Sequence, residues 1–141
     1  MSYIFTVTET DEDVWEPALA VGQLFMGGVD ALGRRILRVE TGLDDVSGDW
    51  VKIDPQAYGE FVTLALQRRG RSTHVGMMQL MDGLLPLMVA LADRLRVEIP
   101  AGSLAERAYL EWARDEERVL LGHVVQNFDG TLSIWGTGVV G

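Results

Sequence analysis

The sequence predicts an α+β fold in which three to four helices pack on a small antiparallel sheet around a long apolar central helix. Three observations predict it. The chain opens with a strand-like alternation of residues, its middle carries apolar residues at helical spacing, and an Asp-Gly pair separates two apolar runs near the C-terminus. The length of 141 residues fits a single domain, 1–141, in which 136–141 form either a flexible tail or an edge extension.

The first strand and the first helix are predicted from residues 3–35. Residues 3–8 follow the two-residue period of a strand. Asp13 and Glu16 then have the spacing of a capping box, and Pro17 suits the first turn of a helix that runs to about Arg35. Four glycines interrupt this helix: Gly22, Gly27, Gly28 and Gly33. Because glycine weakens a helix, they indicate either a bend or a close approach of another group to the backbone.

A loop with a short hairpin and a second helix are predicted next. Residues 38–50 are rich in glycine and acids, and a brief strand follows from Trp50 to Ile53. Asp54 and Pro55 form a helix start, with a capping side chain followed by proline at the first helical position. This helix is predicted to end near Gly70.

The stretch from residue 72 to 96 predicts the central helix. Its apolar residues recur at spacings of four and three, which places them on one stripe of a helix, and a second apolar stripe lies beside the first. Such a helix is expected to be buried on several sides, in a core or against a partner subunit. Asp82 argues against a membrane span, because an aspartate at mid-bilayer costs about 3 kcal/mol. Pro86 is expected to kink the helix.

A fourth helix and a C-terminal hairpin complete the prediction. Ser103 and Glu106 repeat the capping-box spacing ahead of a helix that ends around Arg118. Asp129 and Gly130 then separate two apolar runs, which is a strong hairpin signal. We expect this hairpin to pair with the first strand.

Composition excludes several classes of function. The chain contains no cysteine, so disulfides, thiolate catalysis and cysteine-ligated metals are excluded. A formal net charge of −9 argues against nucleic acid as a partner, because that binding depends on basic residues. The first fifteen residues lack the basic and apolar regions of a signal peptide, so we expect a cytoplasmic protein with no membrane partner.

Neither a cofactor nor a metal is expected. The final residues, 136–141, match the dinucleotide pattern G-x-G-x-x-G, but the helix that must follow that pattern is missing from the sequence. The two histidines, His74 and His123, cannot make a zinc site by themselves, and no pair of histidines or carboxylates has helical i, i+4 ligand spacing together with a third ligand. His123 falls in a predicted strand and is interpreted as structural.

The start of the central helix carries the candidate catalytic and binding residues. His74, near the border of the apolar face, is a candidate for proton transfer. Arg68, Arg69 and Arg71 precede it and, with the free N–H groups of the helix start, predict a seat for a carboxylate or phosphate of the substrate. The alternatives are a buried structural histidine and arginines that balance nearby acids on a solvated surface.

Two further groups of residues have a structural and a functional interpretation. Trp15 is either a packing anchor or part of the substrate site, and Glu16 is either a helix cap or a catalytic acid or base whose pKa the indole raises. Arg34, Arg35 and Arg38 form a second basic cluster at a helix end, where the helix dipole alone explains positive charge.

Seven positions carry a resemblance to a known family: Trp15, Pro17, Leu24, Phe25, Asp54, Phe61 and His74. Over about the first 95 residues the chain resembles a family of small acidic actinobacterial proteins of unknown function. Its size and helix-rich layout also resemble the lysinoalanine-forming proteins of cinnamycin and duramycin lantibiotic clusters. That second likeness implies a cofactor-free homodimer that holds a peptide at its subunit interface.

Two functions follow from these observations. The first is a cofactor-independent tailoring enzyme, or substrate-holding protein, that acts on a peptide or small natural product and uses His74, Glu16 and the arginines to orient the substrate and move a proton. The second is a non-catalytic, dimeric binding, accessory or immunity protein whose central helix forms the interface. A charge at Met81 or Met88 is expected to change the sedimentation mass in the second case.

Overall fold

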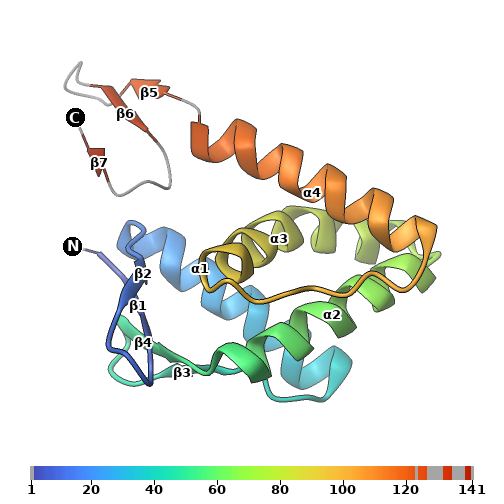
Figure 1. The fold of residues 1–141 in the computed structure, drawn as a ribbon, viewed down its shortest axis with the longest axis horizontal. Helices are drawn as coiled ribbons and strands as arrows, with labels where there is room; N and C mark the ends of the chain where they lie inside the picture. The colour runs from blue at the N-terminus through green and yellow to red at the C-terminus, as the bar shows by residue number, and fades with distance from the viewer. Residues whose placement is uncertain (1, 123, 127–131, 135–138, 141) are drawn as a thin grey trace.

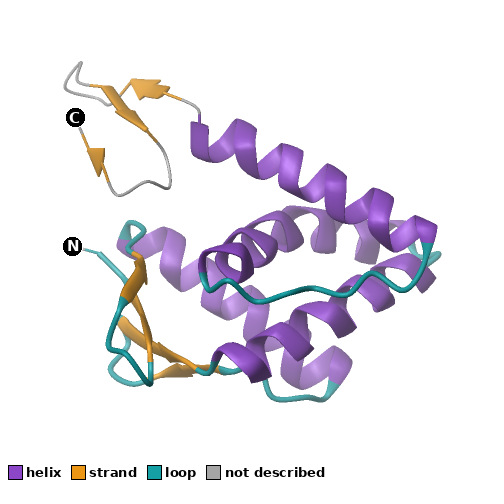
Figure 2. Cartoon of the chain, in the orientation of Figure 1, coloured by secondary structure: helices purple, strands orange, loops and turns teal. Residues whose placement is uncertain are grey.

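The computed structural model describes residues 2–122, 124–126, 132–134 and 139–140, with side chains described as far as Glu116. It confirms the predicted α+β class: four helices pack with a small sheet, and one of them is long and apolar (Figures 1 and 2). The elements follow in this order: β1 (Ile4–Val7), β2 (Asp13–Trp15), α1 (Leu19–Asp30), the π-helix η1 (Ala31–Leu37), β3 (Leu43–Asp45), β4 (Trp50–Ile53), α2 (Pro55–Arg71), α3 (Val75–Arg94), α4 (Leu104–Gly122), β5 (Val124–Gln126), β6 (Leu132–Ile134) and β7 (Val139–Val140).

The N-terminal sheet is mixed rather than wholly antiparallel. Its strand order is β2-β1-β4-β3, and β1 pairs with β4 in parallel, with Phe5 opposite Val51. The other two pairings are antiparallel, and β3 with β4 forms the hairpin expected before Asp54. Parallel neighbours need a long crossover connection, which the helical segment between β2 and β3 supplies. Figure 1 shows this sheet at one end of the molecule.

Two of the three predicted helix caps are confirmed. Asp54 caps α2, because its Oδ1 accepts hydrogen bonds from the N–H groups of Gln56 and Ala57 at 3.1 and 3.3 Å. Ser103 and Glu106 form the reciprocal capping box of α4: the Ser103 Oγ accepts from the Glu106 N–H, and the Glu106 carboxylate accepts from the Ser103 N–H, each at 3.1 Å.

The capping box predicted at Asp13 and Glu16 is wrong. Asp13 belongs to β2, and α1 begins at Leu19 without a side-chain cap. The Asp13 carboxylate instead accepts a hydrogen bond from the Thr6 hydroxyl at 2.8 Å, and the Glu16 carboxylate accepts one from the Ser2 hydroxyl at 2.7 Å. Pairing of β2 with β1 holds this segment extended, so the helix starts later.

The first helix contains the close approaches that its glycines predict. A Cβ on Gly22 would lie 2.3 Å from the Cβ of Tyr3, and a Cβ on Gly33 would lie 2.3 Å from the Cγ2 of Thr41. The helix also changes geometry at Ala31, where the α-helix continues as the π-helix η1. This segment therefore lies tight against the sheet and its connections.

The central helix α3 lies between α2 and α4 (Figure 1). Its second half is buried, with most side chains of residues 85–92 out of contact with solvent, whereas Val75 and Leu80 in its first half are largely exposed. The prediction of burial on several sides therefore holds for the second half only. Within the described part of the chain, α3 alone is long and apolar enough to cross a membrane, a test that core helices of folded domains also pass.

The C-terminal hairpin forms but does not join the first sheet. β5 and β6 pair antiparallel, with Val124 opposite Ile134, and β7 adds to β6 in a separate three-stranded sheet. The predicted pairing with the first strand is therefore wrong. His123, Asp129 and Gly130 lie outside the described residues, as does most of the 136–141 segment.

Candidate functional site

His74 is exposed and caps the helix that follows it. It occupies the N-cap position of α3 with an extended backbone, and its Nδ1 accepts a hydrogen bond from the Met77 N–H at 3.3 Å. The buried structural histidine predicted as an alternative is wrong, because the side chain lies at the surface. Its structural role is to satisfy one of the free N–H groups at the start of the helix.

Trp15 packs in the core next to the small sheet. Its ring lies 4.9 Å from that of Phe5 and 5.1 Å from that of Phe25, and the side chain is buried. Of the two predicted roles of Trp15, the structure therefore shows the packing anchor. Glu16 beside it is exposed, and its carboxylate accepts a hydrogen bond from the Ser2 hydroxyl, so it lies at the surface and not in the aromatic cluster around the indole.

The structure does not bring His74 together with Trp15 and Glu16. The guanidinium of Arg94, at the end of α3, donates a hydrogen bond to the Val14 carbonyl at 3.2 Å, which places β2 beside that end of the helix. His74 caps the opposite end, and a helix of 20 residues is about 30 Å long. One small substrate cannot contact both sets of residues.

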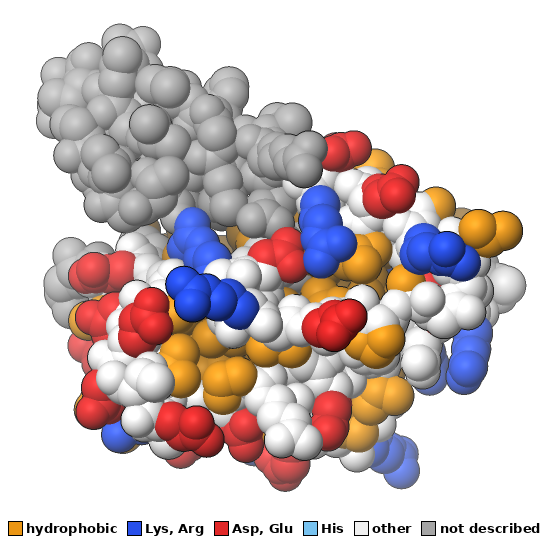
Figure 3. Space-filling model, in the orientation of Figure 1, with side chains coloured by type: hydrophobic (Ala, Val, Ile, Leu, Met, Phe, Trp, Pro, Cys, Tyr) orange, Lys and Arg blue, Asp and Glu red, His pale blue; other side chains and the backbone are white. Residues whose placement is uncertain are grey.

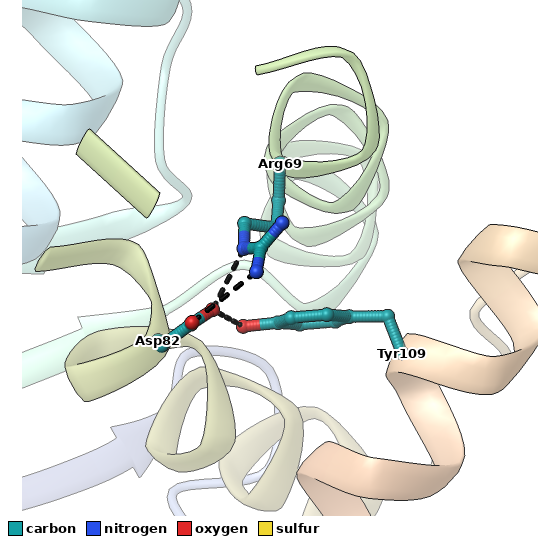
Figure 4. A network of polar contacts seen from close by, with 3 residues as sticks. All are labelled: Arg69, Asp82 and Tyr109. Atoms are coloured by element: carbon teal, nitrogen blue, oxygen red, sulfur yellow. Dashed lines mark hydrogen bonds and ion pairs between the residues drawn. The ribbon is translucent and has the colours of Figure 1, made fainter. Parts of the chain in front are cut away.

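Arg69 forms an ion pair with Asp82, and together with Tyr109 these residues make a polar network that joins three helices (Figure 4). Its guanidinium donates to both carboxylate oxygens of Asp82, at 2.7 and 3.2 Å, and the Tyr109 hydroxyl donates to the same carboxylate at 2.6 Å. The guanidinium also lies 4.9 Å from the centre of the Tyr109 ring. The hydrogen bond from Arg69 holds the pKa of Asp82 below its ordinary value, and burial followed by the hydrogen bond to Asp82 raises the pKa of Tyr109.

The predicted site in which these arginines bind a carboxylate or phosphate therefore does not form at the start of α3. Arg69 points to Asp82, while Arg68 and Arg71 are exposed on α2 and form no ion pair with the described residues. The network of Arg69, Asp82 and Tyr109 holds α2, α3 and α4 together, which is a structural role.

A groove lies between α1–η1 and the first half of α3. It has a volume of about 510 Å³ and is lined almost entirely by apolar or small residues. The lining residues are Gly28, Ala31, Leu32, Arg35, Ile36, Met77, Leu80, Met81, Gly83 and Leu84. We call this site the α1–α3 groove.

Small residues on both walls keep the groove open. Gly28 and Ala31 face it from the first helix, and Gly83 faces it from α3. A Cβ on Gly28 would already lie 3.2 Å from the Leu84 side chain, whereas a Cβ on Gly83 would meet nothing within 4 Å. The helices thus approach each other at Gly28 and leave a space beside Gly83.

The π-helix η1 supplies four of the lining residues and the groove's one charge. Ala31, Leu32, Arg35 and Ile36 come from this segment, and π-helical turns occur frequently at functional sites. Arg35 is exposed and forms no hydrogen bond or ion pair with the described residues, because the neighbouring acid, Asp30, pairs with Arg34 at 2.8 Å.

Sequence reasoning assigned Arg35 to the helix dipole and missed the groove. The available signal was the stripe of residues 24, 28, 31 and 35, which share one face of the helix at spacings of four and three. Leu24 on this face is 79% exposed, and Leu80 across the groove is 76% exposed. Among the described residues, no three His, Asp or Glu side chains are placed to hold a metal ion.

Fold and groove together define the class: a small α+β domain of helices on a mixed sheet that carries an open apolar groove. The chain belongs to a family of unknown function, DUF6086, which matches residues 1–121. This confirms the resemblance to an uncharacterised family. No curated protein and no solved structure matches the chain, so its likeness to lysinoalanine-forming proteins stays a prediction.

Proposed function

We propose that this protein is a non-catalytic binding protein that holds the apolar part of a ligand in the α1–α3 groove. The observation that carries the proposal is an open groove of about 510 Å³ with a nearly continuous apolar lining. Ligand sites of folded proteins fall in the range of roughly 300–1,000 Å³ and are mostly apolar, with few polar groups. Leu80 in the lining is largely exposed, and the exposed Leu24, one helical turn before Gly28, extends the apolar surface beyond the groove.

The lining of the groove supports binding rather than proton transfer. Arg35 is the only charged residue among the lining residues, and none of them carries a carboxylate, imidazole or phenol that could act as a general acid or base. The residues predicted for a tailoring enzyme offer no alternative site, because His74 and Glu16 lie near opposite ends of α3. A catalytic function has no comparable geometric support.

A neutral apolar probe tests this function. N-Phenyl-1-naphthylamine should bind the native protein with a rise in fluorescence, and Gly83→Leu should abolish the rise, because a leucine at this open position fills the groove. Gly83→Ala is the matched control. It also replaces glycine in the helix, but it adds only one methyl group, which is too small to fill the groove, so this variant should retain binding. Thermal melts should show both variants folded and at least as stable as the native protein.

Two results would contradict the proposal. One is a native protein that gives no fluorescence rise with the probe. The other is a rise that Gly83→Leu leaves unchanged, which would place the probe elsewhere on the surface.

A further inference from the structure

We infer that the occupant of the α1–α3 groove is a free single-chain amphiphile with a carboxylate head group. Its chain lies between α1 and α3, and its carboxylate binds the Arg35 guanidinium. This inference rests on the proposed function and adds the chemistry of the ligand. It follows from the charge of the lining, from where that charge lies and from the length of the groove.

Charge at the groove is unbalanced in favour of an anion. Arg35 is the only charged residue of the lining, and its one nearby acid on the same helix, Asp30, is already paired with Arg34. An exposed guanidinium beside an apolar wall offers a forked donor that matches a carboxylate. A wholly apolar ligand would leave this group without a partner.

Arg35 lies at one end of the groove. The first helix runs antiparallel to α3, because Val14, which precedes it, contacts Arg94 at the end of α3, and Gly28 then faces Leu84. Arg35 is seven residues beyond Gly28, toward the N-terminal end of α3, whose first turn contains no acid. The positive end of that helix adds to the field of the guanidinium.

The distance between the two ends fits a chain of medium length. Seven α-helical steps would span about 10 Å, and the distance from Gly28 to Arg35 is somewhat shorter, because the last four steps lie in the π-helix η1, which rises less per residue. A ligand with its head at Arg35 thus extends its chain along Ala31 and Gly83 to the point where Gly28 meets Leu84. A chain of about eight carbons fills this length, and longer chains pass onto the exposed Leu24 one turn further.

The net charge of the protein does not oppose such a ligand at the groove. Figure 3 shows acidic side chains gathered over the end of the molecule that the small sheet forms. The exposed acids of the sheet segments include Glu9, Asp11, Glu12, Asp13, Asp44, Asp45 and Asp49. No acid lines the groove, and salt screens more distant charges beyond about 8 Å at physiological ionic strength.

Calorimetric titration with three octyl compounds tests the inference. Octanoate should bind the full chain more tightly than 1-octanol, and octyltrimethylammonium should bind most weakly. Arg35→Gln should weaken octanoate binding about tenfold, as expected for one charge-assisted interaction, and should weaken 1-octanol binding much less, because the alcohol carries no charge. Arg34→Gln removes the adjacent arginine, which does not line the groove, and should leave all three affinities unchanged.

A chain-length series checks the placement of the tail. From hexanoate to octanoate the affinity should rise about fourfold per methylene, the value for burial of one CH₂ group. Gly83→Leu should remove binding of all these compounds.

The outcomes separate this inference from the proposed function. If the naphthylamine probe and 1-octanol bind but octanoate gains nothing over 1-octanol, or Arg35→Gln leaves octanoate unchanged, the carboxylate assignment is overturned and the binding function stands. If no apolar compound binds, both fail. Two further results would also overturn the assignment: a dimer that Leu80→Glu dissociates and that binds no octanoate, or binding to phosphatidylglycerol vesicles with none to free octanoate.

Discussion

Arg69 and Asp82 form a bidentate ion pair between α2 and α3, and the Tyr109 hydroxyl bonds to the same carboxylate from α4. This arrangement makes Asp82 the shared acceptor of two partly buried donors. Asp82→Ala would leave both donors without a protein acceptor, so we expect it to lower the free energy of unfolding by about 2 kcal/mol. Urea denaturation measures this. Arg34→Ala, which breaks an exposed pair, should change stability by less than about 0.5 kcal/mol.

The ion pair of Arg69 and Asp82 also predicts how the stability of the protein depends on pH. The pKa of Asp82 is lower in the folded protein than in the unfolded chain, where it lies near 3.9. Its contribution is therefore fully present above about pH 4 and is lost as the pH falls through the lower, folded pKa. Melting temperatures from pH 6 to pH 2 should fall more for the native protein than for Asp82→Asn, which has no carboxylate to protonate. Equal slopes would show that the pair does not carry this dependence.

Glycines of the first helix separate into essential and replaceable positions. Gly22→Ala should destabilise the protein by at least about 1–3 kcal/mol, because the new Cβ would lie 2.3 Å from the Tyr3 side chain. Gly27→Ala should instead stabilise it by up to about 1 kcal/mol, since a Cβ there meets nothing within 4 Å and alanine favours the helix. The melting temperatures of the two variants, compared with that of the native protein, test this prediction. A lower melting temperature for Gly27→Ala would contradict it.

Neighbouring residues of α3 should respond to charge in opposite ways. Met81 is 2% exposed, so Met81→Glu buries a carboxylate and should cost more than about 3 kcal/mol. Leu80→Glu places the charge at the rim of the α1–α3 groove, where it should leave the melting temperature within a few degrees and weaken the naphthylamine probe. A charge at Met81 or Met88 therefore disrupts the core and does not test for a dimer. Leu80→Glu is the variant whose sedimentation mass tests for a dimer interface on α3.

Local patterns in the sequence predicted local structure well. Asp54 and the Ser103–Glu106 pair form their caps because every partner lies within three residues. Asp13 and Glu16 have the same pattern, but β2 pairs with β1, and a contact between distant residues overrides the local preference. The parallel pairing of β1 with β4 was not predictable for the same reason.

The candidate site depended on tertiary contacts that no pattern contains. Arg35 and Arg69 both sit in basic clusters at helix ends, and the sequence favoured Arg69 because it precedes the apolar helix. In the fold, Asp82 forms an ion pair with Arg69. Asp30 forms an ion pair with Arg34, so Arg35 stays unpaired among the described residues at the groove. Apolar periodicity likewise shows that α3 has a wide apolar surface without showing which part of it stays uncovered.

His74 offers a final test that distinguishes capping from catalysis. Its Nδ1 accepts the Met77 N–H in the position where aspartate is a preferred N-cap residue. His74→Asp should therefore raise the free energy of unfolding by about 0.5–1 kcal/mol, helped by the dipole of α3, and His74→Ala should lower it by a similar amount. Both variants should bind the naphthylamine probe as the native protein does, because His74 does not line the groove. A loss of probe binding in the more stable His74→Asp would place the imidazole in the binding site after all.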